Sequence, residues 1–169
     1  MTVLKTERLD LDNLRAEDVQ TIVSYRNDPD CAKYQRWEDT SEEAVTAFIK
    51  TFENSVWLSK DEEQHYAIRA GETLVGDLSY FYNEEDRCVT LGITVAPAHQ
   101  RQGYAGEILT AVVEKVREAY PALDIVALID PENAASIALF EKLGFERECY
   151  AEKIASYVYV IYGVQGPLA

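Results

Sequence analysis

The sequence has few of the residues that bind metal ions or form disulfide bonds. Only two histidines and three cysteines occur in its 169 residues, and Cys31, Cys88 and Cys149 lie far apart without the spacing of metal ligands. We therefore expect no zinc site and no other metal site. Three separate thiols are typical of reduced cysteines in a cytoplasmic protein. Long apolar runs and an apolar leader are also missing, so we expect no membrane partner and no secretion signal.

Positive charge is scarce as well. Lysine and arginine together number 16, against 30 aspartates and glutamates, and the net charge is −14. This balance argues against nucleic acid as a partner, because the phosphate backbone requires a basic surface. A field of this sign attracts cationic ligands and speeds their arrival. The alternative is that the acidic surface only keeps the protein in solution.

Hydrophobic periodicity predicts one α+β domain over residues 1–169, long enough to bury a substantial core. The expected order of elements is β-α-α-β-β-β-α-β-α-β-β. This order makes one mixed, mainly antiparallel sheet of about seven strands flanked by about four helices. The strands are expected at 7–14, 64–70, 73–82, 88–95, 125–129 and 157–162, with one more before the last, and the helices at 16–26, 41–53, 104–120 and 134–144.

The most informative stretch is residues 91–106, which read LGITVAPAHQRQGYAG. A buried strand ends at Pro97, a short polar loop follows, and a helix begins at small residues such as Gly103 and Gly106. The first N–H groups of a helix have no partner inside it, and the helix dipole places about half a positive charge there. Small residues leave these N–H groups uncovered, which suits a phosphate or pyrophosphate. Arg101 adds a cation that can bind phosphate oxygens with two hydrogen bonds.

Two motifs resemble the acetyl-CoA elements of the GNAT superfamily of N-acetyltransferases. Residues 100–105, QRQGYA, match the Gln/Arg-x-x-Gly-x-Gly/Ala signature of that family, and residues 133–145, NAASIALFEKLGF, match its second element. The opening residues 6–9, TERL, with a helix and an aromatic loop behind them, are similar to the branch that acetylates ribosomal-protein N-termini. The order of the elements matches too, so the resemblance covers nearly the whole chain and implies the three-layer GNAT fold.

The resemblance implies an acetyl-CoA-dependent N-acetyltransferase. The strand before the signature would separate from its neighbour, so that its peptide groups pair with the pantetheine arm. The N–H of Val95 would donate to the thioester oxygen, the electrostatic stabilisation that acyl transfer needs. Residues 102–106 would hold the pyrophosphate, Asn133 would bond to the pantetheine and Ser136 would approach the thiol. The implied acetyl-CoA-binding residues are Ile93, Thr94, Val95, Gln100, Arg101, Gln102, Gly103, Tyr104, Ala105, Gly106, Asn133 and Ser136.

Several of these residues have a structural alternative. Gly103 also suits a tight turn, and Arg101 also suits an exposed surface. Asn133 is also a good N-cap residue, and the Ser136 hydroxyl is able to bond back to its own helix. The sequence leaves these alternatives open.

The expected catalytic groups depart from the pattern of the family. Many relatives carry a glutamate early on the strand before the signature, but residues 88–91 read CVTL, and Phe140 stands where many carry a tyrosine that protonates the thiolate. An ammonium acceptor must lose a proton. We consider Asp77 or a water chain to Asp86 as the base; the alternative for Asp77 is an edge or surface carboxylate. Ser136 is the nearest hydroxyl and our candidate acid, although a thiolate leaves without much help.

The acceptor is predicted only as a class, a primary amine. The acidic balance favours a small cation such as a polyamine or an aminoglycoside-like amine, whereas the N-terminal pattern favours a protein N-terminus. Tyr34 and Trp37 lie in the loop where the family places its acceptor-binding wall; the alternative is that they fill the core. A second hypothesis is an inactive CoA-binding sensor or interaction domain. Tyr157 and Tyr159 would mark the edge of a homodimer if exposed, or else belong to the core.

Overall fold

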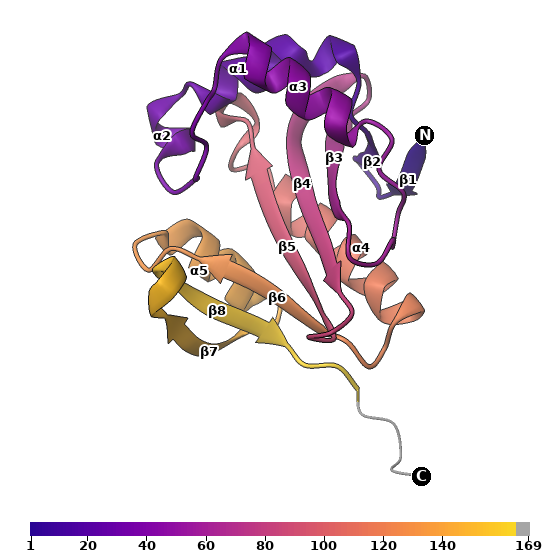
Figure 1. Ribbon diagram of the computed structural model, residues 1–169, viewed down its shortest axis with the longest axis vertical. Coiled ribbons are helices and arrows are strands. Elements are labelled where there is room, and N and C mark those ends of the chain that lie inside the picture. The colour runs from indigo at the N-terminus through magenta and orange to yellow at the C-terminus, as the bar shows by residue number, and fades with distance from the viewer. Residues whose placement is uncertain (165–169) are drawn as a thin grey trace.

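One sheet of eight strands organises the fold of residues 1–164, which the computed structural model describes (Figure 1). The strand order is β1-β2-β3-β4-β5-β6-β8-β7. Neighbouring strands are antiparallel except β5 and β6, which are parallel. The strands are β1 (Thr2–Lys5), β2 (Asp10–Asn13), β3 (Glu63–Ala70), β4 (Thr73–Asn83), β5 (Cys88–Val95), β6 (Asp124–Ile129), β7 (Glu146–Ala151) and β8 (Ser156–Ile161), and the α-helices are α1 (Val19–Arg26), α2 (Pro29–Ala32), α3 (Glu42–Phe52), α4 (Tyr104–Ala119) and α5 (Ala134–Lys142).

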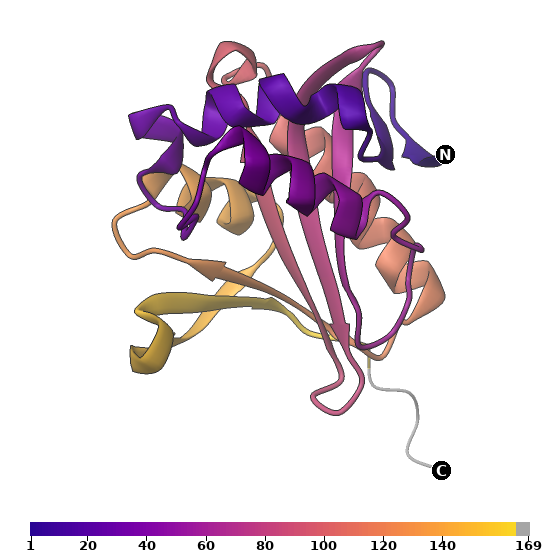
Figure 2. The same ribbon diagram turned by 45° about the horizontal axis from the view of Figure 1, so that its top comes forward.

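Helices cover both faces of this sheet, which gives three layers. α4 and α5 pack on one face, where Ile108, Val112 and Phe140 join the buried strand residues in the larger core. α1 and α3 lie across the other face (Figure 2), where Ile22 and Ile49 belong to a second, smaller core. Because side chains alternate between the faces of a strand, neighbouring residues of one strand belong to different cores: in β3, Ile68 lies in the larger core and Ala67 in the smaller one.

The α+β class and the mainly antiparallel sheet agree with the prediction, but the element counts differ. The structure has eight strands rather than about seven, because a turn closed by the Thr6 N–H to the Leu9 carbonyl (2.8 Å) separates β1 from β2. It has five α-helices rather than about four, because Pro29 opens the short α2. The Asp28 side chain caps α2 by accepting from the Cys31 N–H at 2.9 Å. Aspartate before proline is a favourable helix start.

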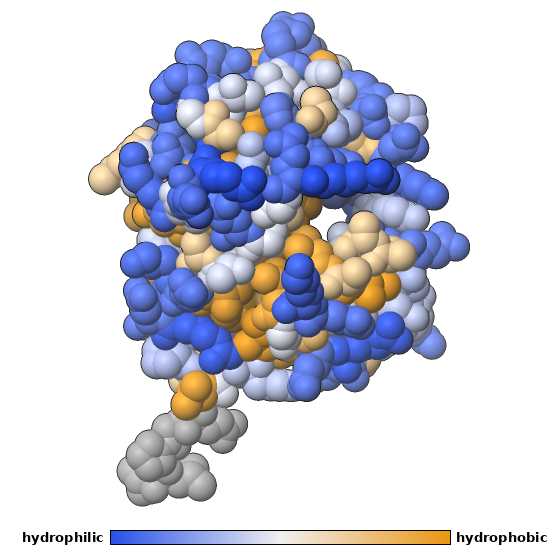
Figure 3. Space-filling view, turned by 180° about the vertical axis from the view of Figure 1, so that it is seen from behind, coloured by the Kyte–Doolittle hydropathy of each residue, from blue (hydrophilic) through white to orange (hydrophobic). Residues whose placement is uncertain are grey.

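The feature that positions the site is a separation of β5 from β6. Their parallel pairing covers only Cys88–Leu91 of β5 and Asp124–Ala127 of β6. β5 then continues to Val95 beside β4, while β6 continues beside β8, so the two halves of the sheet diverge (Figure 1). From behind, the molecule is hollowed between these halves, and apolar side chains gather below the hollow (Figure 3). Within residues 1–164, the last four residues of β5 therefore have one backbone edge without a strand partner.

Of the two alternatives for Tyr157 and Tyr159, the structure favours the core. β8 lies between β6 and β7, and Tyr159 is fully buried with its hydroxyl donating to Glu141 at 3.0 Å. Tyr157 packs against the larger core, so both tyrosines are core residues. Among the described residues, no helix has the length and apolar character needed to span a bilayer.

Candidate active site

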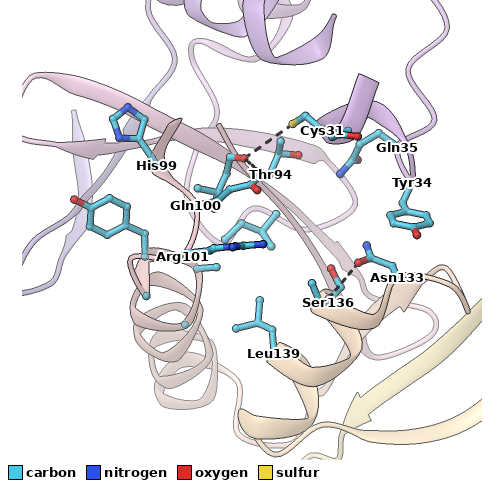
Figure 4. Close-up of a pocket in the computed structure, with 18 residues that line it drawn as sticks. Cys31, Tyr34, Gln35, Thr94, His99, Gln100, Arg101, Asn133, Ser136 and Leu139 are labelled. Atoms are coloured by element: carbon cyan, nitrogen blue, oxygen red, sulfur yellow. Dashed lines mark hydrogen bonds between the residues drawn. The ribbon is translucent and has the colours of Figure 1, made fainter. Parts of the chain in front are cut away.

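A cavity of about 450 Å³ lies where β5 and β6 diverge. Four segments far apart in the sequence form its walls: α2 with the loop behind it, the end of β5, the start of α4 and the start of α5 (Figure 4). Of the twelve residues expected to bind acetyl-CoA, the structure places eleven around this cavity, and only Gln102 does not line it. The lining residues are Asp30, Cys31, Tyr34, Gln35, Ile93, Thr94, Val95, His99, Gln100, Arg101, Gly103, Tyr104, Ala105, Gly106, Asn133, Ala135, Ser136 and Leu139.

The end of β5 offers backbone N–H groups to the cavity. The N–H of Ala96 donates to the Val75 carbonyl on β4 at 2.8 Å. Because peptide groups alternate along a strand, the N–H groups of Val95 and Ile93 face away from β4, toward the gap that β6 leaves. The Val95 carbonyl already accepts from Nε2 of Gln100 at 3.0 Å. The Val95 N–H is therefore the group at this point that a ligand oxygen can use.

The loop and first turn of α4 form an anion-binding shape. Gly103 precedes the helix with φ of 80°, in the left-handed region, and no side chain caps the free N–H groups. Arg101 has φ of 63°, which is uncommon for a residue with a side chain. Alternation of left-handed and right-handed residues turns successive N–H groups to one side and makes a concave site for anions. The Arg101 side chain extends across the cavity toward α5 (Figure 4).

Contacts from the N-terminal segment hold this loop, and sequence analysis did not predict them. Glu107, in the first turn of α4, accepts from the Thr6 hydroxyl at 2.5 Å and from Nε of Arg8 at 2.8 Å. Arg8 also donates to the Gln102 carbonyl at 2.9 Å and lies 4.7 Å from the centre of the Tyr104 ring. Burial acts to raise the pKa of Glu107, but the bonds from Thr6 and Arg8 outweigh it, and that pKa is lowered. Arg8 thus offsets a negative charge that would oppose an anion at this helix end.

The start of α5 supplies the second wall. Oδ1 of Asn133 accepts from the Ser136 N–H at 3.2 Å, so Asn133 is the N-cap of α5 and also lines the cavity. The Ser136 hydroxyl lines the cavity and makes no hydrogen bond to any other residue within 1–164. Ser136 therefore does not bond back to its own helix, and its hydroxyl is available to a ligand.

The α2 side of the cavity contains three residues that sequence reasoning missed, Asp30, Cys31 and Gln35. Cys31 lines the cavity, with its Sγ 4.0 Å from the Val95 carbonyl. Burial, together with Asp28 and Asp77, raises the pKa of Cys31 to about 11, so the thiol stays protonated near neutral pH and is a poor nucleophile. Tyr34 also lines the cavity and donates to the Glu132 carbonyl at 3.1 Å, which joins this loop to the start of α5.

Packing favours the core alternative for Trp37 and also accounts for Phe140. Trp37 does not line the cavity; it packs in the smaller core, with its ring 6.3 Å from that of Tyr25. Phe140, in the position of the usual tyrosine, is 3% exposed and meets Phe145 edge to face. Phe140 does not line the cavity either, so it is a core residue.

Asp77 is neither an edge nor a surface carboxylate. It is 6% exposed, lies opposite Thr94 on the face covered by α1, and accepts a hydrogen bond from the Tyr25 hydroxyl. Burial raises the pKa of Asp77, although the bond from Tyr25 and the charge of Arg26 act in the other direction. Asp77 does not line the cavity itself, but its neighbour Thr94 does.

The other candidate base is remote. Asp86 lies in the turn before β5, where its N–H and carboxylate bond to Asn83. Val95 is at the opposite end of the same strand, seven residues or roughly 23 Å from Cys88. A water chain of that length is not a plausible proton path, so Asp77 is the nearer carboxyl. Within residues 1–164, no group of histidine, cysteine and acidic side chains could hold a metal ion.

Comparisons with known proteins show the family and the fold. The family model for the acetyltransferase (GNAT) domain matches residues 8–146. The uncharacterized N-acetyltransferase YnaD of Bacillus subtilis is 25% identical over 150 residues, 89% of this chain and 86% of YnaD. A GNAT-family acetyltransferase from Bacillus anthracis has a TM-score of 0.82 at 22% identity, covering 96% of this chain and 98% of that one. RimL, a ribosomal L7/L12 α-N-protein acetyltransferase solved with coenzyme A, has a TM-score of 0.75 at 16% identity, covering 96% and 98%. At these identities the two structures show the fold alone.

Proposed function

The chain belongs to the GNAT acetyltransferase family, and we propose that it moves the acetyl group of acetyl-CoA directly to a cationic primary amine. The observation that carries this proposal is the joining of two features in one cavity. The unpartnered N–H groups of Ile93 and Val95 lie at one end, and the uncapped start of α4 lies at the other. The N–H groups of β5 suit the thioester and the amide groups of the pantetheine chain. The start of α4 suits a pyrophosphate.

The residues present fit acetyl-CoA well. The first N–H groups of α4 and the Arg101 guanidinium would hold the phosphates. Beside them, the positive charge of Arg8 offsets the negative charge of the Glu107 carboxylate. Asn133 keeps its side-chain NH2 for the pantetheine after Oδ1 has capped α5. The Val95 N–H would donate to the thioester oxygen and stabilise the negative charge that develops there during transfer.

Direct transfer is favoured over a covalent acetyl-enzyme. The Cys31 Sγ lies 4.0 Å from the Val95 carbonyl, and its raised pKa keeps it a thiol. In direct transfer the amine nitrogen bonds to the acetyl carbon and the carbon–sulfur bond breaks. An ammonium acceptor gives up two protons, one before attack and one that ends on the CoA thiol. We assign the first to Asp77 through water near Thr94, and the second to a path past the Ser136 hydroxyl.

The negative charge of the cavity wall and of the whole protein favours a cationic acceptor. Asp30 lines the cavity on the acceptor side, and the whole chain carries a net charge of −14. Such a field concentrates protonated amines near the opening. A polyamine, an aminoglycoside-like amine and a protein N-terminus all have this charge, and Tyr34 lies where any of them would approach.

The test is thiol release from acetyl-CoA across a panel of polyamines, aminoglycosides and N-terminal peptides, with CoA binding measured by calorimetry. We expect CoA binding and thiol release with at least one amine, matched by a mass increase of that amine. CoA binding with no release from any acceptor would instead favour the inactive CoA-binding domain. Failure to bind CoA would overturn the proposal.

A further inference from the structure

A second cavity, of about 260 Å³, lies on the sheet beyond the proposed site of acetyl transfer. Its lining consists of Glu63, Ser79, Tyr80, Phe81 and Thr90, with no lysine or arginine. Glu63 pairs with Phe81, and Phe81 pairs with Thr90, so these three side chains form one row across β3, β4 and β5. Because the Tyr80 side chain belongs to the larger core on the other face, the hollow offers a carboxylate, two hydroxyls and an aromatic ring, which are groups that favour a protonated amine.

The strand register connects this row to the acetyl-CoA cavity. The next row toward the acetyl-CoA cavity on the same face consists of His65, Ser79 and Gly92. The row after that contains Asp77 and Thr94. All of these residues are on the face opposite α4, which α1 and α3 cover only in part (Figures 1 and 2). Gly92 has no side chain, and only the Ser79 hydroxyl fills the space beside it, so no large side chain of β5 separates the two cavities.

The Glu63 carboxylate is available to a ligand. Oε1 of Glu63 lies 2.8 Å from Nε2 of His65, and Oε2 has no hydrogen-bond partner within residues 1–164. The side chain of Glu63 is 62% exposed, so a ligand reaches it without rearrangement of the fold.

We propose that this second cavity, at Glu63, Phe81 and Thr90, binds the distal ammonium group of a linear diamine or polyamine whose other amine receives the acetyl group. The inference rests on the proposed function and names its acceptor class. Thr90 and Thr94 are four residues apart, or roughly 13 Å at about 3.3 Å per residue. A saturated chain advances about 1.25 Å per bond, so roughly ten bonds span this distance. A protein N-terminus has no second ammonium group at a set distance from the first.

The experiment measures acetylation of diaminobutane, diaminohexane, diaminooctane and diaminodecane, each beside the monoamine of equal length. We compare the unchanged protein with Glu63→Gln and with Glu62→Gln, a matched control because Glu62 is exposed, adjacent and outside the cavity. Binding of the same amines to the CoA-loaded protein is measured by calorimetry, so a result is obtained even without turnover.

We expect the longer diamines to have the lowest KM, and Glu63→Gln to raise that KM about tenfold while the monoamines are unaffected. Glu62→Gln should change neither. The inference is overturned if Glu63→Gln affects diamines and monoamines equally, if Glu62→Gln has the same effect, or if diamines bind the CoA complex no better than monoamines. In each of these cases CoA binding and acetylation of another amine would leave the proposed function standing.

Discussion

Gly103 provides the sharpest test of how the start of α4 binds CoA. Its φ of 80° belongs to the left-handed region, and an added Cβ would have only Arg8 nearby, at 3.4 Å. The cost of Gly103→Ala is therefore conformational rather than a clash. Gly71, in the turn between β3 and β4, has φ of 62° and open space around its Cα. Gly71→Ala also places a residue with a Cβ in the left-handed region, but away from the cavity, and is therefore the matched control.

The two substitutions should destabilise the protein alike but differ in ligand binding. A residue with a Cβ costs about 1–2 kcal/mol in the left-handed region, partly offset by a less flexible unfolded chain. A net loss of about 1 kcal/mol lowers the Tm by roughly 2–4 °C in a chain of this size. If strain turns one N–H of the α4 start away from the phosphates, a hydrogen bond to a charged group worth about 1.5–3 kcal/mol is lost. Gly103→Ala should therefore weaken CoA binding by about tenfold or more.

Thermal unfolding and calorimetric titration with CoA check both expectations on the same samples. Gly103→Asn serves as a partial rescue, because asparagine tolerates the left-handed region better than alanine. The reasoning is refuted if Gly103→Ala loses stability but binds CoA as tightly as the unchanged protein. Equal weakening by Gly71→Ala would also refute it, because the effect would then come from global destabilisation.

Three further predictions concern single side chains. Arg101→Gln should weaken CoA binding most at low salt, whereas Arg117→Gln, at the far end of α4, should leave the titration unchanged. Ser136→Ala should lower kcat less than tenfold, because a thiolate leaves with little help, and a greater loss in steady-state assays would contradict this. Asp77→Asn should lower turnover by about a hundredfold or more if Asp77 accepts the proton. Because burial raises the folded-state pKa of Asp77, the unchanged protein should lose stability relative to Asp77→Asn as pH rises from the unfolded value through that pKa. The stability difference should become independent of pH in acid below the unfolded value. Denaturant unfolding against pH that shows no such trend would contradict the assignment.

The sequence predicts those parts of the fold that depend on local pattern. The alternating residues of β4 and β5 and the helical spacing of α4 set elements that the structure reproduces within one residue. The turn at Thr6–Leu9 and the four-residue α2 were missed, because segments this short have no period to detect. α2 depends instead on one cap, the bond from the Cys31 N–H to Asp28.

The candidate site likewise has a part that the sequence predicts and a part that depends on tertiary contacts. The loop at Arg101 and Gly103 is local in sequence, and its shape follows from residue types. The contact between Arg8 and Glu107 joins residues 99 apart, and nothing in either segment indicates it. For Asp77 the sequence left a base and an edge or surface carboxylate as alternatives, because its strand position alone does not reveal that α1 covers it with Tyr25. Whether a single charged residue is buried depends on tertiary packing, and the periodicity of the sequence does not reveal it.

Asp77 also separates the enzyme from an inactive CoA-binding domain. A domain that only binds CoA needs the N–H groups of Ile93 and Val95 and the start of α4, and Asp77 does not line the cavity that these groups form. Burying a carboxyl costs free energy that an apolar residue of similar size would avoid. The fold nevertheless holds Asp77 opposite Thr94, with the Tyr25 hydroxyl as donor and a raised pKa. A carboxyl in that state accepts a proton more readily than an exposed one, which is the property that deprotonation of an ammonium acceptor requires. Loss of turnover with unchanged CoA affinity in Asp77→Asn would therefore be the result that only the enzyme explains.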